Sequence, residues 1–396
     1  MELDPKLTRA ILVQTFLVQV LAALAIFTVP VLATDIAADL GLDPVVAGLY
    51  TATLFAGAIA GSALAGRVAQ VVGAFAGSLA SIVLIGLGIA VLSAGWLPLL
   101  APSVLFAGFG YGLVNPTASA LLVRVTRPER RGWVFSVKQT GVPLGSALGG
   151  FLAPPLAHAI GWQATLFLIS ALCVLVVLPF AGIALRGFRQ GRGSGESPPG
   201  GVGLLRTHRP LLVLASGSFA LAALQLCLST FLTAHLVLNG GLSLVAAGQV
   251  FACSQIGGAV ARPLWGRLAD WTGSAARTLG LIGVLGSIAG FLTAILNPDW
   301  PLPAMILLST WFGATSLAWN GVFFAEIVRL VRPEEAAAAT GGVQLFTYSG
   351  IVAGPLLFAA VASLAGGFGP AYAVLAAVAL PGAIAIGAMA GRDRRG

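Results

Sequence analysis

Charged residues are scarce in this sequence. Only 9% of the 396 residues are Asp, Glu, Lys or Arg, and 58% are apolar, whereas a soluble domain carries roughly 25% charged residues. So little charge cannot cover the surfaces of the two or three soluble domains that this length would form, and the apolar side chains must therefore face lipid. The scarcity of charge excludes a cytosolic enzyme and a free nucleic-acid-binding protein.

Cysteine and histidine are also rare, with three residues of each. Cys173, Cys227 and Cys253 stand alone within apolar stretches, without the spacing of a metal site or a redox motif, so we interpret them as packing residues. No grouping of Ser, His and acid indicates a hydrolase. We expect no enzyme activity, no cofactor and no metal centre.

Long apolar stretches are abundant instead. A membrane-spanning helix needs about 20 apolar residues. The first stretch is longer than the apolar core of about 7 to 15 residues in a signal peptide, so we favour a span over a cleaved leader. The twelve predicted spans are residues 10–34, 44–65, 73–95, 98–123, 133–156, 162–185, 210–234, 243–265, 278–297, 301–328, 337–362 and 368–390.

Basic residues lie on one side of these spans. If the N-terminus is cytoplasmic, 19 of the 21 Lys and Arg residues lie on the inner side, and only Lys138 and Arg262 lie within spans. An excess of Lys and Arg in short cytoplasmic loops orients membrane proteins. Adding or removing one span would move the later clusters to the opposite face. We therefore predict that both termini are cytoplasmic.

The two halves of the chain match each other. An even number of spans returns the chain to its starting side, so two repeats of six spans have the same orientation. We predict an N-terminal bundle of residues 1–185, a basic cytoplasmic linker of residues 186–209 and a C-terminal bundle of residues 210–396. At an offset of 200 residues the matches are Gly41 with Gly241, Gly57 with Gly257, Gly66-Arg67 with Gly266-Arg267 and Gly73 with Gly273; at an offset of 205 they are Asn115 with Asn320, Gln139 with Gln344, Gly145 with Gly350 and Gly149 with Gly354.

Two parallel six-span repeats are the architecture of the major facilitator transporters. In that family the loop after span 2, and its copy after span 8, carries a Gly-x-Leu-Ala-Asp-x-x-Gly-like signature, which the segment 266–273, GRLADWTG, closely resembles. The first copy has Gln70 in place of the acid. The resemblance covers nearly the whole chain and implies an all-α membrane protein with twelve transmembrane helices. It also implies a multi-pass protein of the cell (inner) membrane, whose halves rock about a substrate near the midplane.

Lys138 and Arg262 are the charged residues inside predicted spans. A charge at the centre of a spanning helix costs about 2.5 to 3.5 kcal/mol on the insertion scale and usually faces a cavity. Spans 5 and 8 meet across the interface between the halves in the superfamily that the chain resembles, so the resemblance implies that both cations border the central cavity. We predict that they bind a small anionic, carboxylate-like substrate. The alternative is structural, with Lys138 extending to the inner surface and Arg262 pairing with Asp270.

Narrower resemblances favour an anion as well. An arginine at this place in span 8 resembles the pattern of oxalate/formate and monocarboxylate carriers, although their span 11 lysine is replaced here by Gln344. The segment 138–145, KQTGVPLG, resembles cyanate-type porters. Polar residues on neighbouring spans either bind the substrate or bond another helix, a contact worth about 0.6 kcal/mol on average. The predicted substrate-binding residues besides the two cations are Tyr111, Asn115, Gln139, Gln255, Asn320 and Gln344, with Gln225 and Tyr348 facing the same cavity.

A second group of residues is predicted to close the cytoplasmic side. Asp270 would hold the start of span 5 through the partial positive charge of a helix N-terminus, and the alternative is a solvated loop charge. Glu326 precedes Arg329 by three residues, so an i, i+3 ion pair is favoured over a proton site. The complete predicted gating set is Arg67, Arg267, Asp270, Glu326 and Arg329.

Two other functions remain open at this point. Export antiporters of the superfamily carry a Gly- and Pro-rich motif in span 5 that residues 141–150, GVPLGSALGG, partly resemble, which makes drug or metabolite efflux the main alternative. A membrane receptor or scaffold without transport is a more remote one. The expected partners are a small-molecule substrate, the lipid bilayer and either protons or a counter-anion, but no nucleic acid. The glycine-rich segment 108–112 lies within a span, where it indicates close helix packing instead of a phosphate loop.

Overall fold

A computed structural model describes residues 5–126, 134, 137–185, 204–206, 208–331 and 336–392. Every regular element in these residues is an α-helix, and eleven helices are long and apolar enough to cross a membrane. The predicted all-α membrane fold is therefore confirmed. The fifth predicted span, residues 133–156, is not among the eleven. It corresponds to α7 (Gly141–Ile160), and most of residues 127–136 before it lie outside the described residues.

The chain divides into two compact units. Unit 1 comprises residues 1–44 and 53–195, and unit 2 comprises residues 45–52 and 196–396. Most of the predicted linker, residues 186–203 and 207, lies outside the described residues. The helices of unit 1 are α1 (Pro5–Val31), α2 (Ala33–Leu40), α3 (Val46–Val71), α4 (Ala74–Ser93), α5 (Leu97–Val125), α7, α8 (Trp162–Leu175) and α9 (Leu178–Leu185), the first turns of α3 belonging to unit 2. Those of unit 2 are α11 (Arg209–Leu238), α12 (Leu244–Thr272), α13 (Ala275–Ala294), α14 (Leu302–Ser316), α15 (Asn320–Leu330), α16 (Ala336–Ala365) and α17 (Phe368–Arg392).

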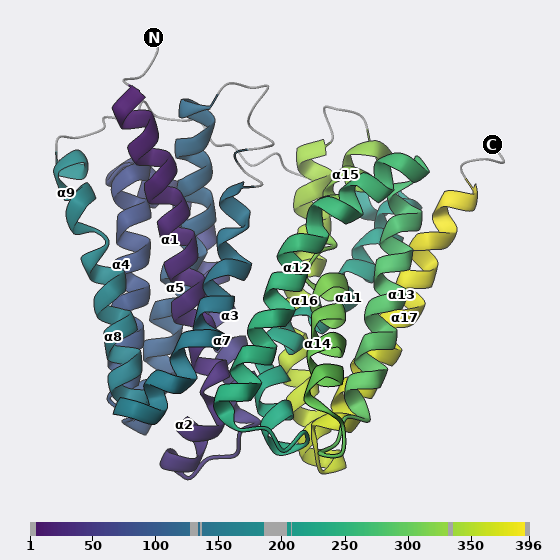
Figure 1. Cartoon of the computed structure of the whole chain (residues 1–396). Helices are drawn as coiled ribbons and strands as arrows, with labels where there is room; N and C mark the ends of the chain where they lie inside the picture. Colours follow the sequence, from purple (N-terminus) through teal and green to yellow (C-terminus); the bar gives the residue numbers. More distant parts are fainter. Residues whose placement is uncertain are drawn as a thin grey trace. The chain divides into compact units, whose positions relative to one another are not determined.

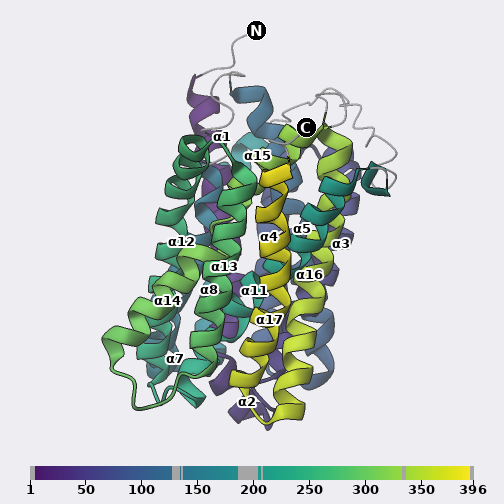
Figure 2. The same cartoon turned by 90° about the vertical axis from the view of Figure 1, so that its right-hand side faces the viewer.

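Within each unit, long helices lie side by side. In unit 1, α4 packs against α5 and α8, and α1 packs against α7 (Figure 1). In unit 2, α13 packs against α17, and α11 packs against α16 (Figure 2). Two predicted spans are interrupted: α8 and α9 share span 6, and α14 and α15 share span 10. Composition alone did not indicate these breaks because the residues on both sides of them are apolar.

Glycines let the helices of a unit approach closely. A Cβ added at Gly108 or Gly112 of α5 would overlap the backbone of Leu54 or Ala58 in α3. In a membrane the lipid is as apolar as the helices, so helix association depends on van der Waals contact. Glycines allow this contact because the helix backbones can approach each other closely. The glycine-rich segment of span 4 is thus a helix-packing surface, as the sequence predicts.

The sequence repeat is visible in the backbone. Three pairs of matched glycines have positive φ in both units: Gly41 with Gly241 (66° and 65°), Gly73 with Gly273 (88° and 60°) and Gly161 with Gly366 (82° and 74°). A residue with a side chain adopts this conformation at a cost, whereas glycine does so freely. Positive φ therefore recurs at corresponding positions of the two repeats, although Gly73 (ψ 150°) and Gly273 (ψ 22°) form different turns.

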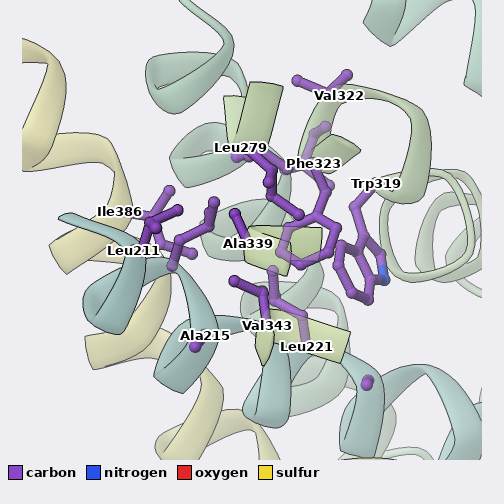
Figure 3. Packing of buried hydrophobic residues seen from close by; sticks show 14 of the residues in the cluster. Leu211, Ala215, Leu221, Leu279, Trp319, Val322, Phe323, Ala339, Val343 and Ile386 are labelled. Carbon is purple, nitrogen blue, oxygen red and sulfur yellow. The ribbon is translucent and has the colours of Figure 1, made fainter. Parts of the chain in front are cut away.

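Each unit has an apolar interior between its helices. Ile11, Phe75, Leu79 and Leu121 join α1, α4 and α5 in unit 1. Figure 3 shows the corresponding cluster of unit 2, where Val343 of α16 lies among buried side chains of α11, α13, α15 and α17. The three cysteines are free thiols within the helices, in keeping with their interpretation as packing residues.

Candidate functional site

Lys138 is a buried cation in unit 1. It lies one turn before α7 begins, only 5% of its surface is exposed, and its Nζ donates a hydrogen bond to Oδ1 of Asn115 on α5. Among the residues that the structure describes, it has no carboxylate partner. A buried ammonium costs free energy unless a counter-charge accompanies it. The structure therefore brings together two predicted substrate-binding residues, and no carboxylate of the described residues pairs with the charge of Lys138.

The other two predicted residues of unit 1 are less closely tied to Lys138. Tyr111 lies one turn before Asn115 on α5, and its ring meets Phe55 edge-to-face at 5.8 Å between centroids. Gln139 follows Lys138 directly and is exposed. Adjacent residues of a helix do not share a face. Tyr111 thus shares the Asn115 side of the site, whereas Gln139 points in a different direction from Lys138.

Arg262 of unit 2 lies at the interruption of span 10. Its Nε and Nη2 donate to the carbonyl oxygen of Leu317, at 3.2 and 3.1 Å, and Nε1 of Trp265 donates to the carbonyl of Ala314 at 2.7 Å. The last carbonyls of α14 have no partners within the helix, and a cation there is stabilised by the negative end of the helix dipole. Arg262 therefore has a structural role, but at Leu317 instead of the predicted partner Asp270.

Amide side chains line the same part of unit 2. Oε1 of Gln225 on α11 accepts from Nε1 of Trp319 at 2.8 Å and from Nδ2 of Asn320 at 3.5 Å, across the break between α14 and α15. Gln255, two turns before Arg262 on α12, is 3% exposed, and its Nε2 has no partner within the described chain. The structure thus links Asn320 to Gln225, two residues that the sequence predicted to face the same cavity. The Nε2 donor of Gln255 has no partner among the described residues. Gln344 is half-buried and Tyr348 is exposed on α16.

The predicted gating residues lie near the ends of helices. Glu326 is completely buried, and its two carboxylate oxygens accept from Arg329 at 2.7 and 3.0 Å, which gives the predicted i, i+3 ion pair. Arg67, Arg267 and Asp270 are exposed. After Asp270, α12 ends at Gly273, whose positive φ makes the tight turn that the signature requires. The proposed closure by Asp270 involves the start of span 5, most of which lies outside the described residues, as does the side chain of Gln70.

Two buried polar residues of the first helix, Gln14 and Gln19, are not among the predicted site residues. Gln14 donates from Nε2 to Ser78 at 2.9 Å, while neither polar atom of Gln19 has a partner within the described chain. Both are completely buried. The available signal was a glutamine inside an otherwise apolar span.

His235 of unit 2 is a third polar residue without a predicted role. It is completely buried and faces Thr293 O at 2.8 Å and Asn239 at 3.1 Å. These contacts join α11 to α13 and identify it as a hydrogen-bonded core residue. Among the described residues there is no cluster of three His, Cys, Asp or Glu side chains suited to a metal.

A comparison with protein families identifies the chain. Residues 15–326 match the family model described as the Major Facilitator Superfamily. The chain belongs to this superfamily. The match includes both units, with α1 and the Glu326–Arg329 helix at its ends, so it agrees with the predicted resemblance over most of the sequence.

Named members of the superfamily cover part or all of the chain. An uncharacterized MFS-type transporter of Mycobacterium tuberculosis is 27% identical over 65% of this chain and 57% of its own length, and an MFS-type efflux pump of Mycolicibacterium smegmatis is 29% identical over 57% of this chain and 54% of its own length. The chain thus matches little more than half the length of these relatives. A bacterial homolog of the human lysosomal transporter Spinster shares the fold, with a TM-score of 0.79, 19% identity and 98% coverage of both chains. The nucleoside transporter NupG has a TM-score of 0.78 at 16% identity, with 96% and 99% covered.

Proposed function

We propose that this protein is a secondary active transporter of a small anionic solute. In this proposal the positive charge of Lys138 selects an anion as the substrate. The observation that supports this proposal is the buried ammonium of Lys138, whose described partner is the neutral amide of Asn115. A substrate carboxylate would supply a counter-charge for the Lys138 ammonium and replace the water that this ammonium loses on burial. Membership of the superfamily supports transport by alternating access.

Arg262 of unit 2 is proposed as a second anion-binding cation of the chain. Two of its donors hold Leu317, so this cation is fixed in position by α14 before any substrate arrives. A guanidinium presents five N–H donors in a planar fork that suits carboxylates. Asn115, Tyr111, Gln255, Asn320 and Gln344 are proposed to supply neutral hydrogen bonds, and Gln139 is retained as a weaker candidate.

Coupling is proposed to use an exchanged anion or a proton carried by the substrate. Both oxygens of Glu326 are occupied by Arg329, which favours a structural ion pair over a proton site. The proposed location is the cell's inner membrane.

The test is uptake of a labelled small carboxylate into proteoliposomes that contain the purified full chain. Lys138→Ala and Arg262→Ala should each reduce uptake by at least about tenfold, because each removes a charge-assisted hydrogen bond. Arg277→Ala, which removes an exposed cation at the start of α13, should retain it and serves as the matched control. Uptake that survives in both variants would show that these residues do not bind the substrate.

Efflux of drugs or metabolites is the second candidate, favoured by the similarity of the chain to the MFS-type efflux pump of Mycolicibacterium smegmatis. A lipophilic cation should be repelled by Lys138, so this function predicts outward movement of such a compound that Lys138→Ala leaves unchanged or increases. Ligand binding without flux of either kind would favour a receptor or scaffold.

A further inference from the structure

Gln19 is a residue of unit 1 with two buried side-chain polar atoms, both of which lack a partner among the described residues. It lies inside α1, completely buried, and neither Oε1 nor Nε2 has a hydrogen-bond partner within the described chain. A buried primary amide offers two donors and an acceptor, and leaving them unpaired is unfavourable. Such a group in a native protein indicates a polar species that occupies the site.

The position of Gln19 relates it to Lys138. A Cβ added at Gly141 would lie 3.0 Å from Cγ and 3.1 Å from Cβ of Gln19, so this side chain packs directly against the first residue of α7. Lys138 precedes Gly141 by three residues, and residues at this spacing are neighbours on one face of a helix. The unpaired amide and the uncompensated ammonium therefore lie beside the same helical turn.

Unit 2 shows that the unpaired amide is not a requirement of the fold. The backbone contact of Gly145 with Val20 in unit 1 recurs as the contact of Gly350 with Phe219 in unit 2, which makes Ser218 the counterpart of Gln19. The hydroxyl of Ser218 accepts from Thr347 at 2.9 Å and donates to the carbonyl of Ala215 at 2.8 Å. The polar group at this place is fully satisfied in unit 2 and unsatisfied only where a buried cation is also present.

We propose that Gln19 is a substrate-binding residue of the Lys138 site and that the site accepts a small 2-hydroxycarboxylate. The ammonium of Lys138 and the amide N–H of Gln19 donate to the carboxylate, and Oε1 of Gln19 accepts from the 2-hydroxyl group. A carboxylate without that hydroxyl leaves Oε1 unpaired, and so does an inorganic anion without a donor. This inference rests on the proposed function, because it specifies the substrate of the same site.

The test compares lactate with propionate, which differ by the hydroxyl group. Thermal-shift titrations of the purified full chain in detergent should give an apparent Kd about tenfold lower for lactate, the effect expected of one hydrogen bond. Gln19→Leu keeps the size of the side chain and should bring the ratio close to one. Gln19→Ser introduces the residue of unit 2 and should abolish the discrimination in the same way, which keeps the test valid if the leucine variant fails to fold.

Gln14→Leu is the matched control, because Gln14 is equally buried on α1 but bonds Ser78 of α4. It should keep the preference for lactate. An unchanged ratio in the two Gln19 variants, with binding still lost in Lys138→Ala, would overturn this inference while leaving the proposed function intact, and would mean that only water occupies the amide. If neither carboxylate stabilises the native chain, this inference fails, whereas the proposed function stands or falls on anion uptake into proteoliposomes.

Discussion

Unit 1 and unit 2 join their first and fifth predicted spans through the same glycines. Gly145 of α7 meets the backbone of Val20 in α1, and Gly350 of α16 meets the backbone of Phe219 in α11. Two turn glycines match as well, with Gly41 and Gly241 at φ values of 66° and 65°. The two units thus share glycines where helix backbones approach closely and where a turn has positive φ.

The same repeat differs where polar groups are buried. Lys138 in unit 1 corresponds to Val343 in unit 2, a completely buried core residue, and Arg262 corresponds to the exposed Ser62. Figure 3 shows that the position of Val343 is a tightly packed apolar one. A unit can therefore fold without a cation at this position. For this reason we propose that Lys138 binds the substrate.

The largest effect on stability is expected when a lysine is introduced into unit 2 at the position that corresponds to Lys138. Val343→Lys should lower the free energy of unfolding by at least about 3 kcal/mol, because it buries an unpaired charge in the core of unit 2. Thermal denaturation in detergent measures the change. Val343→Met introduces a side chain of similar length without charge and separates the cost of the charge from that of size. Equal stability of the two variants would contradict the apolar character of this position.

The reverse exchange should stabilise the protein and inactivate it. Lys138→Val removes a buried charge and should raise the free energy of unfolding by about 1 to 4 kcal/mol, the range seen when buried ions are replaced by apolar residues. Because Asn115 is exposed, water can replace its lost hydrogen bond. Ligand-dependent stabilisation and carboxylate uptake should disappear in the same variant. A loss of stability without a loss of uptake would show that Lys138 is structural.

The shared glycines should be equally sensitive in the two units. Gly145→Ala and Gly350→Ala should each cost about 1 to 3 kcal/mol, since the added methyl group collides with a neighbouring helix backbone. Gly321→Ala is the control: no atom outside its own helix lies within 4 Å of the added Cβ, and alanine favours the helix by up to about 1 kcal/mol. A large effect in one unit alone would mean that the repeat no longer supports both contacts.

The fold followed from the sequence more fully than the site did. Apolar length, the one-sided basic residues and matched glycines such as Gly145 and Gly350 indicated helices and repeats, because each reports a local requirement of lipid or backbone. The sequence also indicated Lys138 and Asn115, since charge and amides are conspicuous inside apolar spans.

Tertiary contacts accounted for what the sequence did not show. The capping of Leu317 by Arg262 depends on a helix break between apolar residues, which carries no local signal. Gln19 is of interest because its amide has no hydrogen-bond partner among the described residues. Its packing against Gly141 then shows which part of α7 the amide lies beside.

A smaller effect is expected at the helix break that distinguishes unit 2. In unit 1, α5 is continuous and the position of Trp265 is taken by Ala65, whereas in unit 2 Trp265 bonds the carbonyl of Ala314 at 2.7 Å beside the end of α14. Trp265→Phe removes this bond and should cost about 1 kcal/mol, measured by thermal denaturation. The ratio of lactate to propionate affinity should stay constant, because this cap belongs to the scaffold. A changed ratio would place the end of α14 in the substrate site.

The smallest effect concerns the end of unit 1 at α2, where Asp35 lies near His158 of α7, a position that unit 2 fills with Ser363. Partial burial raises the pKa of the Asp35 carboxyl above its ordinary value, and the charge of His158 acts in the opposite direction. Since the folded protein holds this proton more tightly than the unfolded chain, stability should decline as the pH rises from about 4 through the raised pKa.

Asp35→Asn should abolish that decline, whereas Asp299→Asn, which alters an acid between α13 and α14 of unit 2, should preserve it. His158→Ala removes the opposing charge, so the pKa of Asp35 should rise further and the decline should extend to higher pH. Thermal denaturation measured at a series of pH values distinguishes these outcomes. A wild-type profile that Asp35→Asn does not change would show that this carboxyl is as well hydrated in the folded protein as in the unfolded chain. The Asp35 and Asp299 regions of the two units would then be electrostatically equivalent.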